Sequence, residues 1–158
     1  MPQETILYDG AALDRNLQAD LARDGRLLLV EPIIFGRAAM GETVRSGLLR
    51  DHWRVRRAGE LVFADVLRLQ GDIAATLTRA GIAGGAGAMA SVLYVGPDAA
   101  ARLTGLRQLL PDTAGCSLIR EGVLFSRMLA GDGFELRAVL IPAVEYLSAA
   151  PLPKVWRL

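Results

Sequence analysis

Alternation of polar and apolar residues between positions 12 and 21 constrains the fold of this chain most strongly. The even positions from 14 to 20 are polar and the odd positions are mostly apolar, with Arg15 as the exception. A period of two is typical of a half-buried strand, although leucines four residues apart in the same stretch also fit one face of a helix. The turn pair Asp24-Gly25, which an apolar run follows, favours the strand. We therefore predict a hairpin over residues 12–35, in which residues 26–35 form a strand covered on both faces.

A second alternation lies between residues 50 and 70. Trp53 and Val55 alternate with polar or charged residues, Ala58-Gly59 supplies a turn, and residues 61–69 have the composition of a returning strand. We predict a second hairpin here. The arginines at 54, 56 and 57 put positive charge on both faces of its first strand, which is typical of a solvated edge strand that charge protects from further pairing.

Residues 71–110 are rich in alanine, glycine and leucine, and they predict a mixed segment. The expected elements are a short helix capped by Asp72, a flexible loop at 81–87, a strand at 90–95, and a helix at 97–110 that ends before Pro111.

The last part of the chain, residues 115–149, predicts two strands and a helix. The strands cover 116–119 and 123–128, and the helix begins at Asp132-Gly133. Pro142 interrupts the helical pattern and is expected to kink the helix or to lie near a helix start. The whole pattern predicts a β-rich α+β fold in a single region, 1–158, with antiparallel hairpins in its N-terminal half and strand–helix elements in its C-terminal half.

Composition excludes several classes of protein. The chain has 158 residues, a net charge of +1 and one cysteine, so we expect no internal disulfide and no bulk attraction to nucleic acid or an anionic membrane. We expect no signal peptide and no membrane helix, which favours a cytoplasmic location. Hydrophobic residues make up 52% of the chain. That share indicates either a well-filled core or apolar surface that a partner covers.

The candidates for catalysis and nucleotide binding are few. His52 and Cys116 are the single histidine and the single cysteine, and no local motif joins them into a catalytic pair. Residues 85–90 match the pattern GxGxxA, but that fingerprint follows a strand and opens a helix, whereas here it precedes a predicted strand. From the residues alone, an enzyme that uses Cys116 and His52 and a nucleotide-binding module at residues 81–87 stay as alternatives with little support.

Carboxylates around one glycine-bracketed turn are the remaining candidates for chemistry. Glu31 lies in the apolar strand and Glu42 follows the turn, with Glu4 and Asp9 in the first segment. Oxygen ligands alone bind a divalent transition ion weakly, so such a site suits an ion in transit and no tightly bound cofactor is expected. Two simpler alternatives are a salt bridge between Glu42 and Arg37, and a Glu31 that accepts hydrogen bonds from local backbone N–H groups.

The residues around this turn resemble a known family. Gly36-Arg37-Ala38-Ala39-Met40-Gly41-Glu42 is similar to the GRxAMGE signature of the urease accessory protein UreD, called UreH in some organisms. Further segments resemble that family in the same order: Pro2-Gln3-Glu4-Thr5-Ile6, Asp9-Gly10-Ala11, residues 26–30, Gly115-Cys116-Ser117-Leu118 and Pro151-Leu152-Pro153-Lys154-Val155-Trp156.

The resemblance implies a β-rich chaperone subunit that takes part in nickel incorporation into apo-urease. It implies a complex with a helical UreF-like protein and a nickel-binding, UreG-like GTPase, and an internal path for nickel. Carried over by position, Glu31 and Glu42 become candidates for a transient nickel path, and Gly36, Arg37, Met40 and Gly41 become the motif that shapes it.

One departure from the family affects these expectations. Family members are longer at the N-terminus, so the chain resembles the C-terminal portion of a UreD and an incomplete UreD-type β domain. The alternative function is therefore a partial fragment that acts only as a protein-interaction module.

Overall fold

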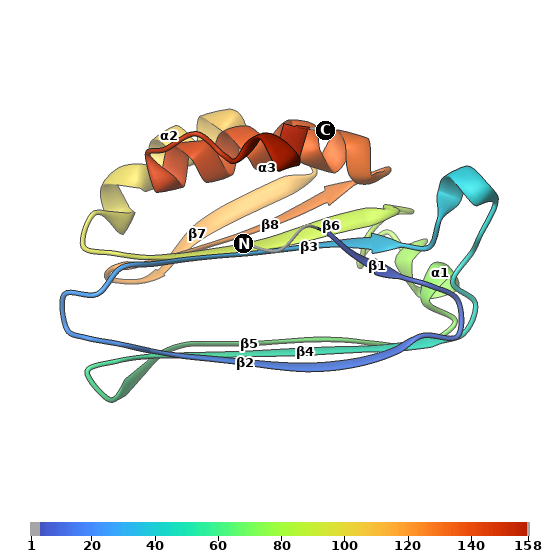
Figure 1. Cartoon of the computed structure of the whole chain (residues 1–158), viewed down its shortest axis with the longest axis horizontal. Helices are drawn as coiled ribbons and strands as arrows, with labels where there is room; N and C mark the ends of the chain where they lie inside the picture. The colour runs from blue at the N-terminus through green and yellow to red at the C-terminus, as the bar shows by residue number, and fades with distance from the viewer. Residues whose placement is uncertain (1–3, 158) are drawn as a thin grey trace.

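The computed structural model describes residues 4–157, which form two sheets packed face to face (Figure 1). Residues Pro2 and Gln3 of the first family-like segment lie outside the described residues. The larger sheet has the order β1-β3-β6-β8-β7, and the smaller has the order β2-β4-β5. The strands are β1 (Thr5–Leu7), β2 (Ala12–Leu21), β3 (Leu27–Phe35), β4 (Gly47–Arg57), β5 (Glu60–Gly71), β6 (Ala88–Val95), β7 (Ala114–Arg120) and β8 (Val123–Ala130). This architecture confirms the predicted β-rich α+β fold class.

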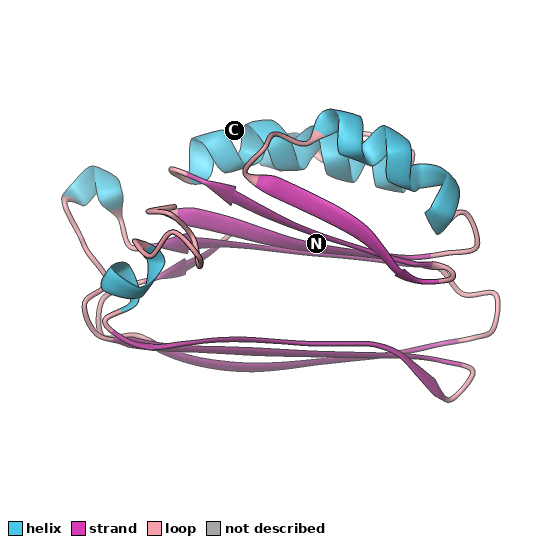
Figure 2. Ribbon diagram, turned by 180° about the vertical axis from the view of Figure 1, so that it is seen from behind, coloured by secondary structure: helices cyan, strands magenta, loops and turns pink. Residues whose placement is uncertain are grey.

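Two long helices, α2 (Ala99–Leu109) and α3 (Gly133–Ser148), lie on the outer face of the larger sheet, and no helix of the described residues covers the outer face of the smaller sheet (Figure 2). A short helix, α1 (Ile73–Leu77), and two 3-10 turns, η1 (Ala38–Met40) and η2 (Lys154–Arg157), complete the described elements. Among the described residues, no helix combines the length and apolar character needed to cross a bilayer.

Local signals placed most elements correctly. Ala58 and Gly59 both have positive φ, as a two-residue hairpin turn requires, and they join β4 to the antiparallel β5. The side chain of Asp72 accepts a hydrogen bond from the Ala75 N–H at 2.8 Å and caps α1 as predicted. Asp132 caps α3 in the same way. Helix α3 runs through Pro142 as its tenth residue, so the option that this proline lies near a helix start is wrong.

The hairpin predicted over residues 12–35 is wrong in its pairing, although both of its strands exist. Strand β2 pairs in parallel with β4 in the smaller sheet, whereas β3 pairs with β1 and β6 in the larger one. The turn at Asp24-Gly25 therefore carries the chain from one sheet to the other. The physical reason is burial: β2 has one exposed face and β3 is covered on both, so the two strands suit different sheets.

The predicted edge strand around arginines 54, 56 and 57 is also wrong. Strand β4 lies between β2 and β5, so it is the central strand of the smaller sheet. Arg54 and Arg56 point to the exposed outer face, where a central strand accepts charge as readily as an edge strand does.

Three apolar clusters form the core. One lies between the larger sheet and helices α2 and α3, and includes Val92, Leu124, Leu136 and Leu140. The other two lie between the sheets: one around Leu7, Ile33 and Leu49, and the other around Trp53, Leu93 and Val123. A row of charged and polar residues separates these last two clusters.

Candidate functional site

Charged and polar side chains lie between the two sheets, at the positions that separate the inter-sheet apolar clusters; Glu31 and Asp51 are buried, whereas Arg15, Asp65 and Arg127 are half-buried. We call this group the interior charged layer. Its members are Arg15 on β2, Glu31 on β3, Asp51 on β4, Asp65 on β5, Ser91 on β6 and Arg127 on β8. Glu31, Ser91 and Arg127 are direct cross-strand partners in the larger sheet, and Arg15 and Asp51 are cross-strand partners in the smaller one. The strand register therefore brings residues far apart in sequence into one row.

Arg15 connects the two sheets through this layer. Its Nε and Nη2 donate to the two carboxylate oxygens of Asp51 at 3.0 and 2.7 Å, and its Nη1 donates to Glu31 Oε2 at 2.6 Å. Trp53 Nε1 donates a further bond to Asp51 at 3.1 Å. The Glu31 residue is only 8% exposed. A carboxylate this buried requires a charged or hydrogen-bonding partner, and Arg15 supplies it to both acids.

The other half of the layer is a second ion pair. Arg127 Nη2 donates to Asp65 Oδ2 at 2.6 Å, and the Arg127 guanidinium lies 5.2 Å from the centre of the Phe125 ring. The Nε of Arg127 is buried and has no hydrogen-bond partner among the described residues. Three carboxylates and two guanidinium groups give the layer a formal charge of −1.

Burial raises the pKa of Glu31 above its ordinary value. The positive charge of Arg15 partly offsets this effect, and the nearby Asp51 carboxylate adds to the increase. The Glu31 carboxylate therefore gains a proton at a higher pH than an exposed glutamate does. Keeping the Glu31 carboxylate ionised at neutral pH costs desolvation free energy.

This pKa shift predicts a pH-dependent difference in stability between the wild type and Glu31→Gln. The folded chain binds a proton at Glu31 more readily than the unfolded chain, so the wild type gains stability relative to the variant as the pH falls. The gain is complete below the ordinary value of 4.5 and is lost as the pH rises through the raised value. Urea unfolding of both proteins between about pH 7 and pH 5 measures the difference. A wild type that becomes more stable relative to Glu31→Gln as the pH rises would contradict the raised pKa of Glu31.

The glycine-bracketed turn that follows β3 forms a separate network at one end of the sheets. Arg37 donates from Nε and Nη2 to the two carboxylate oxygens of Glu42 at 3.0 and 3.1 Å, and its guanidinium lies 4.6 Å from the centre of the Tyr8 ring. The hydrogen bonds from Arg37 hold the pKa of Glu42 below its ordinary value. The structure thus contains the simpler alternative for Glu42, the salt bridge to Arg37.

The two glycines of this turn have different roles. Both have positive φ, but a Cβ on Gly36 would lie 3.1 Å from the Glu42 backbone oxygen, whereas one on Gly41 would meet nothing within 4 Å. Gly36 therefore permits a close approach of two chain segments, and Gly41 ends the turn η1 in the left-handed conformation. Met40 lies at the tip of the turn and is 74% exposed.

The other acidic candidates are also engaged. Glu4 forms an ion pair with Arg137, and Asp9 Oδ1 accepts the backbone N–H groups of Arg45 and Ser46 at 2.7 and 2.8 Å. Glu31 and Glu42 belong to different networks, and in the part of the chain that the structure describes no three His, Cys, Asp or Glu side chains are placed to hold a metal ion together. Glu31 accepts from the side chain of Arg15, so the local backbone acceptor role considered for it is not what the structure contains.

The possible pairing of His52 with Cys116 is wrong. Cys116 packs into the apolar cluster beneath the helices, whereas His52 alternates with the inward-facing Asp51 and Trp53 and so faces the outside of the smaller sheet. Both sheets lie between the two side chains. Burial also raises the pKa of the Cys116 thiol, which disfavours a reactive thiolate.

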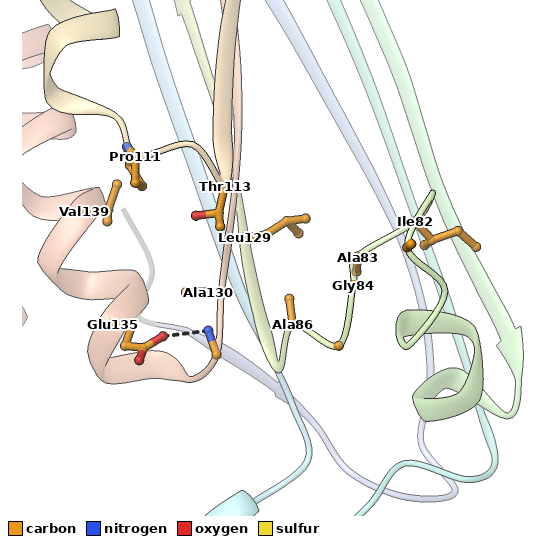
Figure 3. Close-up of a pocket in the computed structure, with 13 residues that line it drawn as sticks. Ile82, Ala83, Gly84, Ala86, Pro111, Thr113, Leu129, Ala130, Glu135 and Val139 are labelled. Carbon is orange, nitrogen blue, oxygen red and sulfur yellow. Dashed lines mark hydrogen bonds between the residues drawn. The ribbon is translucent and has the colours of Figure 1, made fainter.

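The glycine-rich loop at residues 81–87 lines a pocket of about 530 Å³ with Pro111, Thr113 and Val139 (Figure 3). The loop leads into β6 and does not open a helix, so the context of a dinucleotide fingerprint is missing, as predicted. The residues that line the pocket include no lysine or arginine. The one carboxylate, Glu135, already accepts a hydrogen bond from the Gly131 N–H at 2.9 Å, which Figure 3 marks.

Comparison with known proteins places the chain among urease accessory proteins. Residues 1–157 match the family described as UreD urease accessory protein. A urease accessory protein UreD of Rhizobium leguminosarum bv. viciae is 48% identical over 159 residues, which cover 100% of this chain and 58% of that protein. The UreD of Methylobacterium sp. (strain 4-46) is 48% identical over 99% of this chain, and the UreD of Ruegeria pomeroyi is 47% identical over 99%. The chain spans 58% and 61% of the length of these two relatives, respectively.

Proposed function

Because this chain belongs to the UreD family of urease accessory proteins, we propose that it assists the delivery of nickel to apo-urease as a non-catalytic chaperone subunit. Nickel is then cargo that passes through the protein, and no tightly bound cofactor is required. The proposed partners are a UreF-like protein, a UreG-like GTPase and apo-urease, and the proposed location is the cytoplasm. The division of the chain into one region, 1–158, stays a prediction.

The observation that carries this proposal is the position of Glu31 inside the molecule. A carboxylate in an apolar strand is costly, and a chain that needed only a stable core would place an apolar residue there. Instead, the interior charged layer holds three carboxylates with two guanidinium groups, which leaves one negative charge for a cation. Glu31 and Asp51, which share Arg15, offer carboxylate oxygens, and oxygen ligands alone bind a divalent transition ion only weakly.

Arg15 is the group that a passing cation would displace. Its side chain is 23% exposed and extends from β2, an edge strand of the smaller sheet, so the core does not fully enclose it. While it contacts Glu31 it neutralises the carboxylate, and when it moves away the carboxylate becomes available. Arg15 would therefore act as an exchangeable counter-ion for nickel.

The glycine-bracketed turn supports a different part of the proposed function. Its carboxylate, Glu42, is already paired with Arg37, whereas Met40 presents an exposed apolar side chain at the tip. An exposed methionine on a turn fixed by a salt bridge suits contact with a partner protein better than it suits a metal path. In this proposal Glu31 contacts the nickel ion in transit. The docking turn for a partner protein is formed by Gly36, Arg37, Met40 and Gly41.

Complementation of a urease-producing host that lacks its own UreD tests this proposal. Expression of the chain together with the other accessory proteins is expected to restore urease activity and to allow co-purification with the UreF-like protein. A chain that co-purifies but leaves urease inactive would act only as a protein-interaction module, the alternative function. A chain that does neither would contradict both.

A further inference from the structure

Arginines from three turns converge at the end of the sandwich opposite the Gly36–Glu42 turn. Arg23 lies in the β2–β3 connection, Arg57 ends β4, and Arg120 ends β7. The pairing of Leu27 with Val95 and of Val95 with Val123 puts these turns at one end of the sheets, on the left in Figure 1. The three side chains line an open pocket of about 480 Å³, which we call the arginine pocket.

Among the described residues, Arg57 has no carboxylate partner in this pocket. Its Nη2 donates a long hydrogen bond, 3.4 Å, to the Gly25 carbonyl oxygen, and its Nε is buried with no partner among the described residues. Gly122 lies against the same guanidinium, because a Cβ there would be 3.1 Å from Arg57 Nη1. A buried guanidinium N–H that lacks an acceptor is costly unless a ligand supplies one.

The charge of the pocket favours an anion. Arg120 is already paired, because its Nη2 donates to Glu60 Oε1 at 2.9 Å. Arg23 and Arg57 make no ion pair within residues 4–157, and Glu121 is the other acidic residue in the lining. Three guanidinium groups and two carboxylates leave a formal charge of +1 at the pocket.

Two β-bulges lie in the strands beside the pocket and affect the direction of its arginine side chains. The β4–β5 ladder has a bulge between Val55 and Arg56, and the β7–β8 ladder has one between Leu118 and Arg120. Bulges bend a strand and re-aim the side chains beside them. Both bulges lie within two residues of an arginine of the pocket.

We propose that the arginine pocket binds a carboxylate-rich segment of a protein partner. The planar guanidinium fork matches a carboxylate in two parallel hydrogen bonds, and the lining contains no aromatic ring on which a nucleotide base could stack. Val62, Pro97 and Ala58 provide an apolar wall for the aliphatic part of an acidic side chain. The arginine pocket lies at the other end of the molecule from the docking turn, and peptide binding there does not depend on nickel transfer.

Titration of a fluorescently labelled hexaglutamate peptide with the full chain at low ionic strength, followed by fluorescence anisotropy, tests this site. Arg23→Gln and Arg57→Gln are each expected to weaken binding about fivefold to tenfold. Arg54→Gln is the matched control, because Arg54 is exposed on the same strand as Arg57 but points to the outer face of the smaller sheet. It removes the same charge and is expected to leave binding unchanged.

Circular dichroism melting of each variant separates loss of binding from loss of folding. Arg57 is partly buried, whereas Arg23 is exposed, so Arg23→Gln tests the site even where Arg57→Gln unfolds. Failure of the wild type to bind the peptide would overturn the proposal, as would equal weakening by Arg54→Gln and Arg23→Gln. Displacement of the peptide by inorganic phosphate at lower concentration than by glutarate would assign the pocket to phosphate and would also overturn it.

Discussion

Replacement of Arg15 with methionine is expected to lower the free energy of unfolding by about 3 kcal/mol. Arg15 is the shared counter-ion of Glu31 and Asp51, whose side chains are only 9% and 6% exposed. Burial alone would lower the pKa of Arg15, but its bonds to Asp51 and Glu31 outweigh that effect and raise it. Without the guanidinium, two buried carboxylates would face each other with no opposing charge. Urea unfolding followed by tryptophan fluorescence measures the loss.

Arg50→Met is the matched control for this prediction. Arg50 forms an ion pair with Asp14 across the same two strands at 3.1 Å, but on the exposed face of the smaller sheet. Exposed pairs contribute at most about 1 kcal/mol, so the control is expected to lose less than a third of the stability that Arg15→Met loses. Equal losses in the two variants would mean that the interior charged layer does not behave as a buried network.

Turns, caps and strand positions could be predicted because the signals that set them are local. Asp72 and Asp132 cap helices through bonds to residues three positions away, and Ala58-Gly59 closes a hairpin between adjacent strands. Each of these interactions involves residues close in sequence. Patterns within short stretches of the sequence are therefore sufficient to predict them.

Strand partners could not be predicted in the same way. The pairing of β2 with β4 joins residues 36 positions apart, and nothing in either strand alone specifies it. One available signal was nevertheless missed. Strand β2 alternates and β3 is continuously apolar, and strands with such different burial belong to sheets with different coverage. The residues of the turn between them favour a tight turn and so predict a hairpin, but they do not distinguish a turn within one sheet from a turn between two.

Glu31 is a candidate from the sequence because it flanks the glycine-bracketed turn and by position in the family, whereas its partners Arg15 and Asp51 are not among the predicted candidates. Both are charged residues at inward positions of alternating strands. Arg15 interrupts the apolar positions of β2, and Asp51 lies two residues from Trp53, on the same face of β4. A charge at an inward position predicts a buried partner on another strand. Which partner it meets depends on the packing of the two sheets, which the sequence pattern does not reveal.

Glu31→Gln is expected to impair nickel delivery without unfolding the protein. Glutamine has nearly the same shape, its carbonyl oxygen can still accept the bond from Arg15, and Asp51 still balances the guanidinium charge. What the variant loses is the negative charge in the layer. A passing cation would then meet no excess of carboxylate, and transfer is expected to fall about tenfold, the equivalent of about 1.4 kcal/mol.

The nickel content of urease purified from the complemented host tests the central claim most directly. With the other accessory proteins present, Glu31→Gln is expected to give urease with about a tenth of the wild-type nickel. Asp14→Asn, which removes an exposed carboxylate from the same sheet, is expected to give wild-type nickel content. Urease fully loaded with nickel in the presence of a folded Glu31→Gln variant would contradict a role of the interior charged layer in nickel delivery.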